Sequence, residues 1–335
     1  MSLTPIDLSH VKYNVVALLS DGAQINLDEV AENIAWEENK DELSVRLNLT
    51  LRDIAYGQGR LSAALALCTI VYLYADWGTG KQEVFRGSIW EWEHSQIYND
   101  AIIVTAYDLL YYLKKSKDNR YYAQGTSTSS ILTDIFGSWE APIGKIDFPN
   151  VTHQKIVYKN KALSAMIQET LDDAKRLGGV EGIVRADKGK VYVSIIGANT
   201  TVYGFTAQGN LAQTKDKYSM TDLITRVVIV GKEDEEGRPK VEATLDGKTE
   251  YGILQAIQSI GSGTLAEAKQ TAKETILEKG IPKREVTLQA AEFPAIRKGD
   301  VIRLETDCLT GHFFVCGISH NATTMTMQME VKPVG

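Results

Sequence analysis

The sequence predicts an α+β fold that is mostly β, with two similar β units flanking a small α+β unit and a helical insertion in the second β unit. Three observations predict this class. Apolar and polar residues alternate with a period of two in the first third, a 3.6-residue repeat runs through 163–177, and strand-like segments return after residue 285. The predicted units are 1–113, 114–213 and 214–335, with the insertion at about 233–284.

The first unit consists of predicted strands. Leucine and valine alternate with polar residues over 43–51, which indicates a half-buried strand. The segment 69–74 leads into a turn at 76–80, and apolar segments at 84–89 and 102–106 follow, as in an antiparallel meander. A short helix at about 109–113, followed by the polar stretch 114–119, places the first boundary near residue 113.

The middle unit contains the clearest helix of the chain. Its apolar positions are Leu163, Met166, Ile167, Leu171, Ala174 and Leu177. Asn160 can cap the start of this helix, and Gly178-Gly179 ends it. A weaker helix is predicted over 129–136, and strands over 182–185 and 190–195.

The second β unit is interrupted. A strand at 226–230 is followed by the loop 232–239, which is too charged for a core and reads as a solvated excursion. Thr264 and Glu267 have the spacing of a capping box and open a helix over 265–279 that ends at Gly280. Its apolar stripe is thin, which is typical of a surface helix. The later predicted strands are 285–288, 301–304, 313–318 and 324–331.

Composition excludes several classes. The chain has 335 residues, 36 Lys+Arg and 43 Asp+Glu, and its net charge of −7 disfavours a nucleic-acid-binding protein. The longest apolar run, 63–75, is shorter than the roughly 20 residues of a membrane helix. The N-terminus has no signal-peptide pattern, so we expect synthesis in the cytosol. The three cysteines are predicted to be reduced thiols, with Cys68 and Cys316 in the core.

No catalytic motif stands out. The nucleotide-binding, zinc-protease and serine-hydrolase patterns are missing from the sequence. The adjacent carboxylates Glu37-Glu38 and Asp172-Asp173 point to different sides of an element and are interpreted as solvated faces. The scattered histidines are predicted to be exposed or hydrogen-bonded: His10, His94, His153, His312 and His320. We therefore predict no catalytic, cofactor-binding or metal-binding residues, and no cofactor.

An aromatic cluster in the first unit has two interpretations. Such residues can form a sugar or peptide platform, but they also serve as cross-strand pairs and subunit anchors. We favour packing and interface roles. The cluster comprises Trp77, Trp90, Trp92, Tyr98, Tyr107, Tyr111 and Tyr112.

The two β units share a weak repeat. Segments 71–80 and 302–311 both end in Asp-x-x-Thr-Gly, and an aromatic residue followed by Gly and Ile comes downstream in each, at 85–89 and 314–318. Two ordinary hairpin turns or a duplication explain these residues. The equal order of elements favours duplication.

The run 84–90, followed by Ile103-Val104-Thr105-Ala106-Tyr107-Asp108 and by 109–118, resembles the XkdQ/YqbQ-type hub proteins of contractile phage tails, prophage remnants and tail-like bacteriocins. The similarity continues through 161–163, 221–227, 251–255, 282–288 and 296–303, and so covers essentially the whole chain. The resemblance implies two β-barrel-like tube domains flanking the middle domain.

The family also implies assembly. A homotrimer at the base of the tail tube would adapt a sixfold tube to a threefold spike, with the tail tube protein, the spike and other baseplate proteins as partners. The chain would then be part of a phage or bacteriocin tail particle. A negatively charged ring would let DNA pass without specific binding, although ordinary solubility explains the same charge.

The alternative is a tail-tip peptidoglycan hydrolase or a carbohydrate-binding module. A glycosidase needs two carboxylates across a cleft, and a pair brought together from distant positions leaves no trace in the sequence. The missing catalytic constellations favour the structural role.

Overall fold

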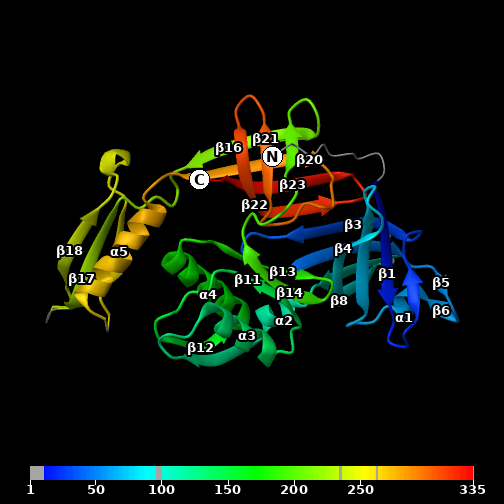
Figure 1. Cartoon of the computed structure of the whole chain (residues 1–335), viewed down its shortest axis with the longest axis horizontal. Helices are drawn as coiled ribbons and strands as arrows, with labels where there is room; N and C mark the ends of the chain where they lie inside the picture. Colours follow the sequence, from blue (N-terminus) through cyan, green and yellow to red (C-terminus); the bar gives the residue numbers. More distant parts are fainter. Residues whose placement is uncertain (1–10, 96–99, 234–235, 262, 335) are drawn as a thin grey trace. The chain divides into compact units, whose positions relative to one another are not determined.

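The computed structural model describes residues 11–95, 100–233, 236–261 and 263–334, and it confirms a mostly β fold of the α+β class. The chain divides into two compact units (Figure 1): Met1–Thr214 together with Thr287–Gly335, and Lys215–Val286. Among the described helices, none is long and apolar enough to cross a membrane. The three-domain division at residues 113 and 213 stays a prediction.

The first β module, residues 12–107, is built on the alternation seen in the sequence. In β4 (Val45–Arg52), the side chains of Val45, Leu47, Leu49 and Leu51 are buried and their neighbours are not. The strand order is β3-β4-β9-β8-β7-β1-β2. The other elements are β1 (Lys12–Leu18), β2 (Gln24–Asn26), β3 (Ala31–Glu38), β5 (Ala55–Tyr56), β6 (Gly59–Arg60), α1 (Leu61–Ala64), β7 (Ile70–Asp76), β8 (Gln82–Ser95) and β9 (Ala101–Tyr107).

The middle region packs two helices over two small sheets. Ile131, Ile135 and Phe136 are fully buried against Met166 and Ile167. The sheets are β10-β12 and β11-β14-β13. The elements are α2 (Leu110–Lys115), β10 (Lys117–Tyr122), α3 (Thr128–Ser138), β11 (Ile143–Asp147), β12 (Ile156–Ala162), α4 (Leu163–Gly178), β13 (Gly182–Asp187) and β14 (Lys190–Ile195).

Three local expectations from the sequence are wrong. The stretch 114–119, expected to leave the domain as a linker, contains the last residues of α2 and the start of β10. Ala162, not Asn160, is the N-cap of α4, and Asn160 lies two residues before it with a φ of 47°. Cys68 is exposed and Cys316 half-buried, so neither is a fully buried core residue. Gly179 does end α4, in the left-handed conformation at φ 70°.

The second β module repeats the strand order of the first. Its elements are β15 (Tyr203–Thr206), β16 (Leu211–Ser219), β20 (Lys283–Ala291), β21 (Val301–Glu305), β22 (Thr310–Asn321) and β23 (Thr326–Pro333). They lie in the order β16-β20-β23-β22-β21-β15, and the first module has β3-β4-β9-β8-β7-β1. Six strands taken in chain order therefore have the same spatial order in both modules. The pairing direction differs at the last strand, since β1 is antiparallel to β7 whereas β15 is parallel to β21.

The shared turn motif is used differently in the two copies. In the first, Asp76 Oδ1 accepts hydrogen bonds from the amides of Gly78 and Gly80, at 2.9 and 3.1 Å. In the second, Thr306 Oγ1 accepts from the amide of Leu309 at 2.9 Å. The strand order, rather than the turn chemistry, carries the repeat.

The small α/β unit, Lys215–Val286, has a core of its own. α5 (Leu265–Lys279) covers one face of the sheet β18-β17-β19, and its Ala268 and Ala272 pack on Val227 and Ile229. The predicted capping box of Thr264 and Glu267 is present. β17 (Arg226–Glu233) and β18 (Pro239–Asp246) extend into the predicted loop 232–239, of which 234–235 lie outside the described residues. β19 is Gln255–Ser259, and the 3₁₀ turn η1 is Thr249–Tyr251.

Candidate functional site

Three histidines are held by carboxylates, which confirms the hydrogen-bonded interpretation for them. His153 Nδ1 lies 2.6 Å from Asp173 Oδ2, and its Nε2 lies 2.8 Å from Thr128 Oγ1. His94 and His320 have their own carboxylate partners, described below. His312 is exposed in β22, and His10 lies outside the described residues.

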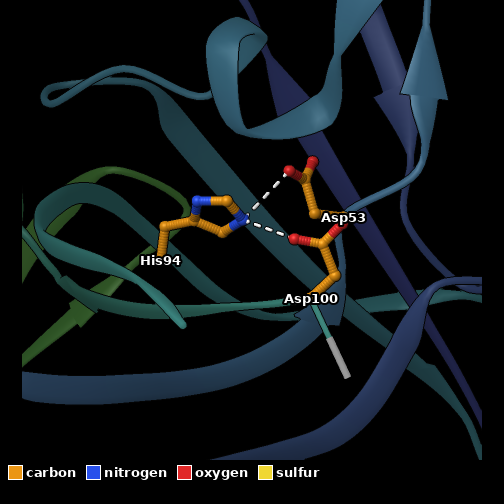
Figure 2. Close-up of side chains that lie close together, drawn as sticks. All are labelled: Asp53, His94 and Asp100. Atoms are coloured by element: carbon orange, nitrogen blue, oxygen red, sulfur yellow. Dashed lines mark hydrogen bonds and ion pairs between the residues drawn. The ribbon is translucent and has the colours of Figure 1, made fainter. Parts of the chain in front are cut away.

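His94 is part of the one group of three or more metal-ligating side chains, among the described residues, whose ligating atoms lie close together. Figure 2 shows its Nε2 facing two carboxylates, 3.2 Å from Asp53 Oδ2 and 2.9 Å from Asp100 Oδ1. His94 is near the end of β8, Asp53 directly follows β4, and Asp100 directly precedes β9. β9 pairs with both β4 and β8, so the three side chains come together where these neighbouring strands begin or end.

An arginine already pairs with both carboxylates of this group. Arg60 Nε donates to Asp53 Oδ2 at 2.8 Å, and the same guanidinium pairs with Asp100. The amide and hydroxyl of Ser62 also donate to Asp53, at 2.8 and 2.7 Å. Burial tends to raise the pKa of Asp53, but the hydrogen bonds from Ser62 and Arg60 outweigh it and hold that pKa below its usual range. The group ties the segment 53–62 to the sheet, and the absence of a metal site stays a prediction.

A buried network of charges joins the two β modules to the middle region. Arg297, which precedes β21, donates from Nε and Nη2 to Glu38 at the end of β3, at 3.0 and 3.2 Å. Its Nη1 also donates to the carbonyl of Ala186 in β13, at 3.1 Å. Arg185, from the same strand, pairs with Asp300 at 2.7 Å. Because Glu38 is buried, the interpretation of Glu37-Glu38 as a solvated face is wrong for Glu38.

A second buried group lies on the same junction. His320 Nδ1 is 2.9 Å from both oxygens of Glu292, and the Tyr13 hydroxyl donates to Glu292 at 2.9 Å. The Trp36 ring stacks on His320 with centroids 4.4 Å apart. Burial and the neighbouring Glu292 raise the pKa of the Tyr13 hydroxyl. Tyr13 and Trp36 belong to the first module and the other two residues to the second, so the group fixes one module on the other.

The β3–β22 pairing makes the junction continuous. Residues 35–38 of β3 pair antiparallel with 318–321 of β22, beyond the part of β22 that pairs with β21. The two modules therefore form one 13-stranded sheet. Gly317 lies beside this crossing, and a Cβ there would be 3.2 Å from the amide nitrogen of Lys40.

The aromatic cluster is mostly packing. Tyr107 stacks on Tyr111 at 3.6 Å, and Trp90 meets Tyr111 edge-on at 4.7 Å. Trp77 contacts Phe293 of the second module at 6.2 Å. Trp92 is 38% exposed, Tyr112 is also exposed, and Tyr98 lies outside the described residues. The packing interpretation is confirmed for Trp77, Trp90, Tyr107 and Tyr111.

Proteins with a similar fold include tail proteins. A tail protein from Neisseria meningitidis is 12% identical, with a TM-score of 0.69, over 96% of this chain and 97% of that one. A 43 kDa prophage tail protein from Shewanella oneidensis is 13% identical, with a TM-score of 0.65, over 96% and 98%. At such low identity these likenesses establish the fold alone, which is that of phage tail proteins.

Sequence comparison gives the family. The protein YqbQ of Bacillus subtilis is 24% identical over 221 residues, 65% of this chain and 67% of that protein. The family model described as YQBQ-like matches residues 34–332. This match spans most of both β modules, the middle region and the small α/β unit. The chain belongs to the YqbQ-like family.

Proposed function

We propose that the chain is a structural hub subunit of a contractile tail or tail-like bacteriocin, which forms a homotrimer and adapts a sixfold tube to a threefold spike. The repeated strand order of the two β modules carries this proposal. Three chains with two similar modules each supply six similar modules around one axis, and a threefold arrangement of whole chains. Tail tube, spike and other baseplate proteins are then its partners.

The junction inside the chain suggests how the ring closes. In it, β3 of the first module pairs with the later half of β22 of the second. The corresponding strands are β16 of the second module and the later half of β8 of the first, and neither has a strand partner on that side among the described residues. In a closed ring, β16 of one chain pairs with β8 of the next. Around the ring, the β3–β22 junctions within each chain then alternate with the β16–β8 junctions between chains.

The side chains of these two strands suit such a contact. Beyond Ile89, the β8 residues Glu91, Trp92 and Glu93 are exposed. β16 presents exposed Ala212 and Lys215. Opposite charges across paired strands favour pairing, and a closed ring removes two open strand edges that would otherwise promote aggregation.

Native mass spectrometry of the chain alone and with purified tail tube and spike proteins tests the assembly. We expect monomer or weak trimer for the chain alone, since −7 per subunit becomes −21 in a trimer and like charges repel at low salt. With both partners present we expect three copies per complex. Any other copy number contradicts the proposal.

We propose further that the chain has no catalytic activity. In the one three-residue group of histidine and carboxylates among the described residues, both carboxylates are bound to Arg60, which disfavours their use as a nucleophile or general base. Incubation with peptidoglycan should release no soluble fragments. Release that is lost in Asp53→Asn or Asp100→Asn would support the hydrolase alternative instead.

A further inference from the structure

The end of α5 and the end of β18 enclose an apolar groove of about 460 Å³ within the small α/β unit. Leu245, Ile276, Leu277 and Ile281 supply its apolar lining. Leu277 is 82% exposed and Ile281 is 54% exposed. Isolated exposed apolar residues are common on protein surfaces, but several that converge on a concavity mark an interaction site.

Two glycines shape the floor of the groove. A Cβ on Gly280 would lie 2.1 Å from the carbonyl oxygen of Ile276, and a Cβ on Gly247 would lie 2.6 Å from Ile276 Cγ2. Real Cβ atoms do not approach so closely, so a side chain at Gly247 would push Ile276 of α5 away from the end of β18, and a side chain at Gly280 would disrupt the last turn of α5 itself. The close approach of α5 to the end of β18 therefore depends on Gly247.

The rim of the groove is positive. Lys248 and Lys273 line it, and none of the ion pairs found in the described parts of the chain involves either lysine. The one lining carboxylate, Asp246, accepts two hydrogen bonds from Arg226, at 2.6 and 3.1 Å, which neutralise its charge. An apolar floor with two uncompensated ammonium groups complements an apolar side chain flanked by carboxylates.

We propose that this groove binds a segment of another tail protein that presents a large apolar side chain between acidic residues. The inference rests on the proposed role in a multiprotein particle, and it adds the chemistry of one contact. It does not depend on trimer formation, because all nine lining residues belong to the small α/β unit of a single chain. A docked apolar anchor would cover Leu277 and Ile281 while the lysines hold its flanks.

A displayed library of random 12-residue peptides, selected on the immobilised full chain, tests the chemistry. Counter-selection uses Leu277→Asp, which changes an exposed side chain and should leave thermal unfolding unchanged. We expect enriched peptides with a Leu, Ile, Phe or Trp flanked by Asp or Glu within three positions. No enrichment over Leu277→Asp, or enrichment of peptides without acidic residues, overturns the proposal.

The affinity of a synthetic peptide carrying the enriched sequence then measures how much each groove residue contributes to binding. Leu277→Asp should weaken its affinity by about tenfold or more, as removal of a central anchor does. Lys248→Ala with Lys273→Ala should weaken it several-fold at low salt and flatten its salt dependence. Ile257→Asp is the matched control, since Ile257 is 70% exposed on the sheet face that α5 does not cover. Equal loss in the control contradicts a specific groove.

Sedimentation of the full chain tests whether the groove binds a second copy of this chain instead of a foreign segment. If the groove bound another copy of this chain, the wild type would self-associate and Leu277→Asp would not. That result would replace a foreign partner with self-assembly and overturn the proposal. Identical sedimentation of both chains, with peptide binding lost only in Leu277→Asp, supports it and is independent of the copy number that tests the hub role.

Discussion

Arg297 and Glu38 form a buried bidentate ion pair across 259 positions of sequence, with nitrogen–oxygen distances of 3.0 and 3.2 Å. The pair joins the second β module to the end of β3 in the first. Burial tends to raise the pKa of Glu38, but Arg297 and the nearby Arg185 and Lys298 hold that pKa below its usual range. The junction between the modules therefore contains a charge that is satisfied only when the modules are in contact.

Removing one member of this pair should be costly. Arg297→Met leaves Glu38 buried without its partner, and we expect the free energy of unfolding to fall by about 3–5 kcal/mol. Urea denaturation measures the change. Arg46→Met is the control, because its partner Glu37 is more exposed than Glu38 and the expected loss is about 1 kcal/mol or less. Equal losses of unfolding free energy in the two variants would mean that the buried pair stabilises the fold no more than the exposed pair does.

Asp108 should make stability depend on pH. Burial raises the pKa of its carboxyl to about 7, although the amides of Val45 and Leu110 donate to it. The folded state thus keeps the proton to higher pH than the unfolded chain, whose carboxyl loses it near pH 4. The stability that the protonated form provides is lost as pH rises from about 4 to about 7, by up to about 1.4 kcal/mol per pH unit.

Asp108→Asn isolates that contribution. The difference in unfolding free energy between the variant and the wild type should shift in favour of the variant between pH 5 and pH 8. Urea titrations at both pH values measure it. A difference that stays constant over this range would show that Asp108 is already ionised in the folded chain at pH 5.

Gly87 should tolerate no side chain. A Cβ at this position would lie 2.2 Å from the carbonyl oxygen of Tyr107, where β8 and β9 approach closely. We expect Gly87→Ala to lower the unfolding free energy by several times the cost of Gly59→Ala, whose Cβ would meet nothing within 4 Å. Thermal unfolding of both variants decides, and similar melting temperatures would contradict the predicted clash.

The small α/β unit, here also called the arm, should be removable from the rest of the chain. The insertion predicted from the sequence suggests deleting 233–279. That deletion would keep β17 but remove α5, which covers Val227 and Ile229, so it would expose their apolar side chains. Deleting 221–281 instead joins the ends of β16 and β20, which are neighbours in the sheet. We expect a folded β core and reduced incorporation into baseplates. Unfolding of the whole chain, or unchanged incorporation, would show that the arm has a different role.

The sequence allowed prediction of those elements that depend on residues only a few positions apart. The 3.6-residue repeat gave α4 and the Thr264–Glu267 capping box gave α5, because both depend on residues a few positions apart. The burial of Glu38 was not predictable, since its partner Arg297 is distant in sequence. The same holds for the Asp53, His94 and Asp100 group, whose members lie at the ends of three different strands. Equal strand order was only suggested by the repeated turn, which the two copies build differently.

Cross-linking of β8 to β16 tests the closed threefold ring most directly. The experiment uses a variant that lacks Cys68, Cys308 and Cys316. Cysteines replace Glu93 in β8 and Ala212 in β16. A short bis-maleimide can link these two cysteines even if they are not directly opposite each other in the paired strands. With tail tube and spike proteins present, denaturing gels should show covalent dimers and trimers and nothing larger. A ladder that continues beyond three copies, or no cross-link in complexes that contain three chains, would contradict the proposed ring.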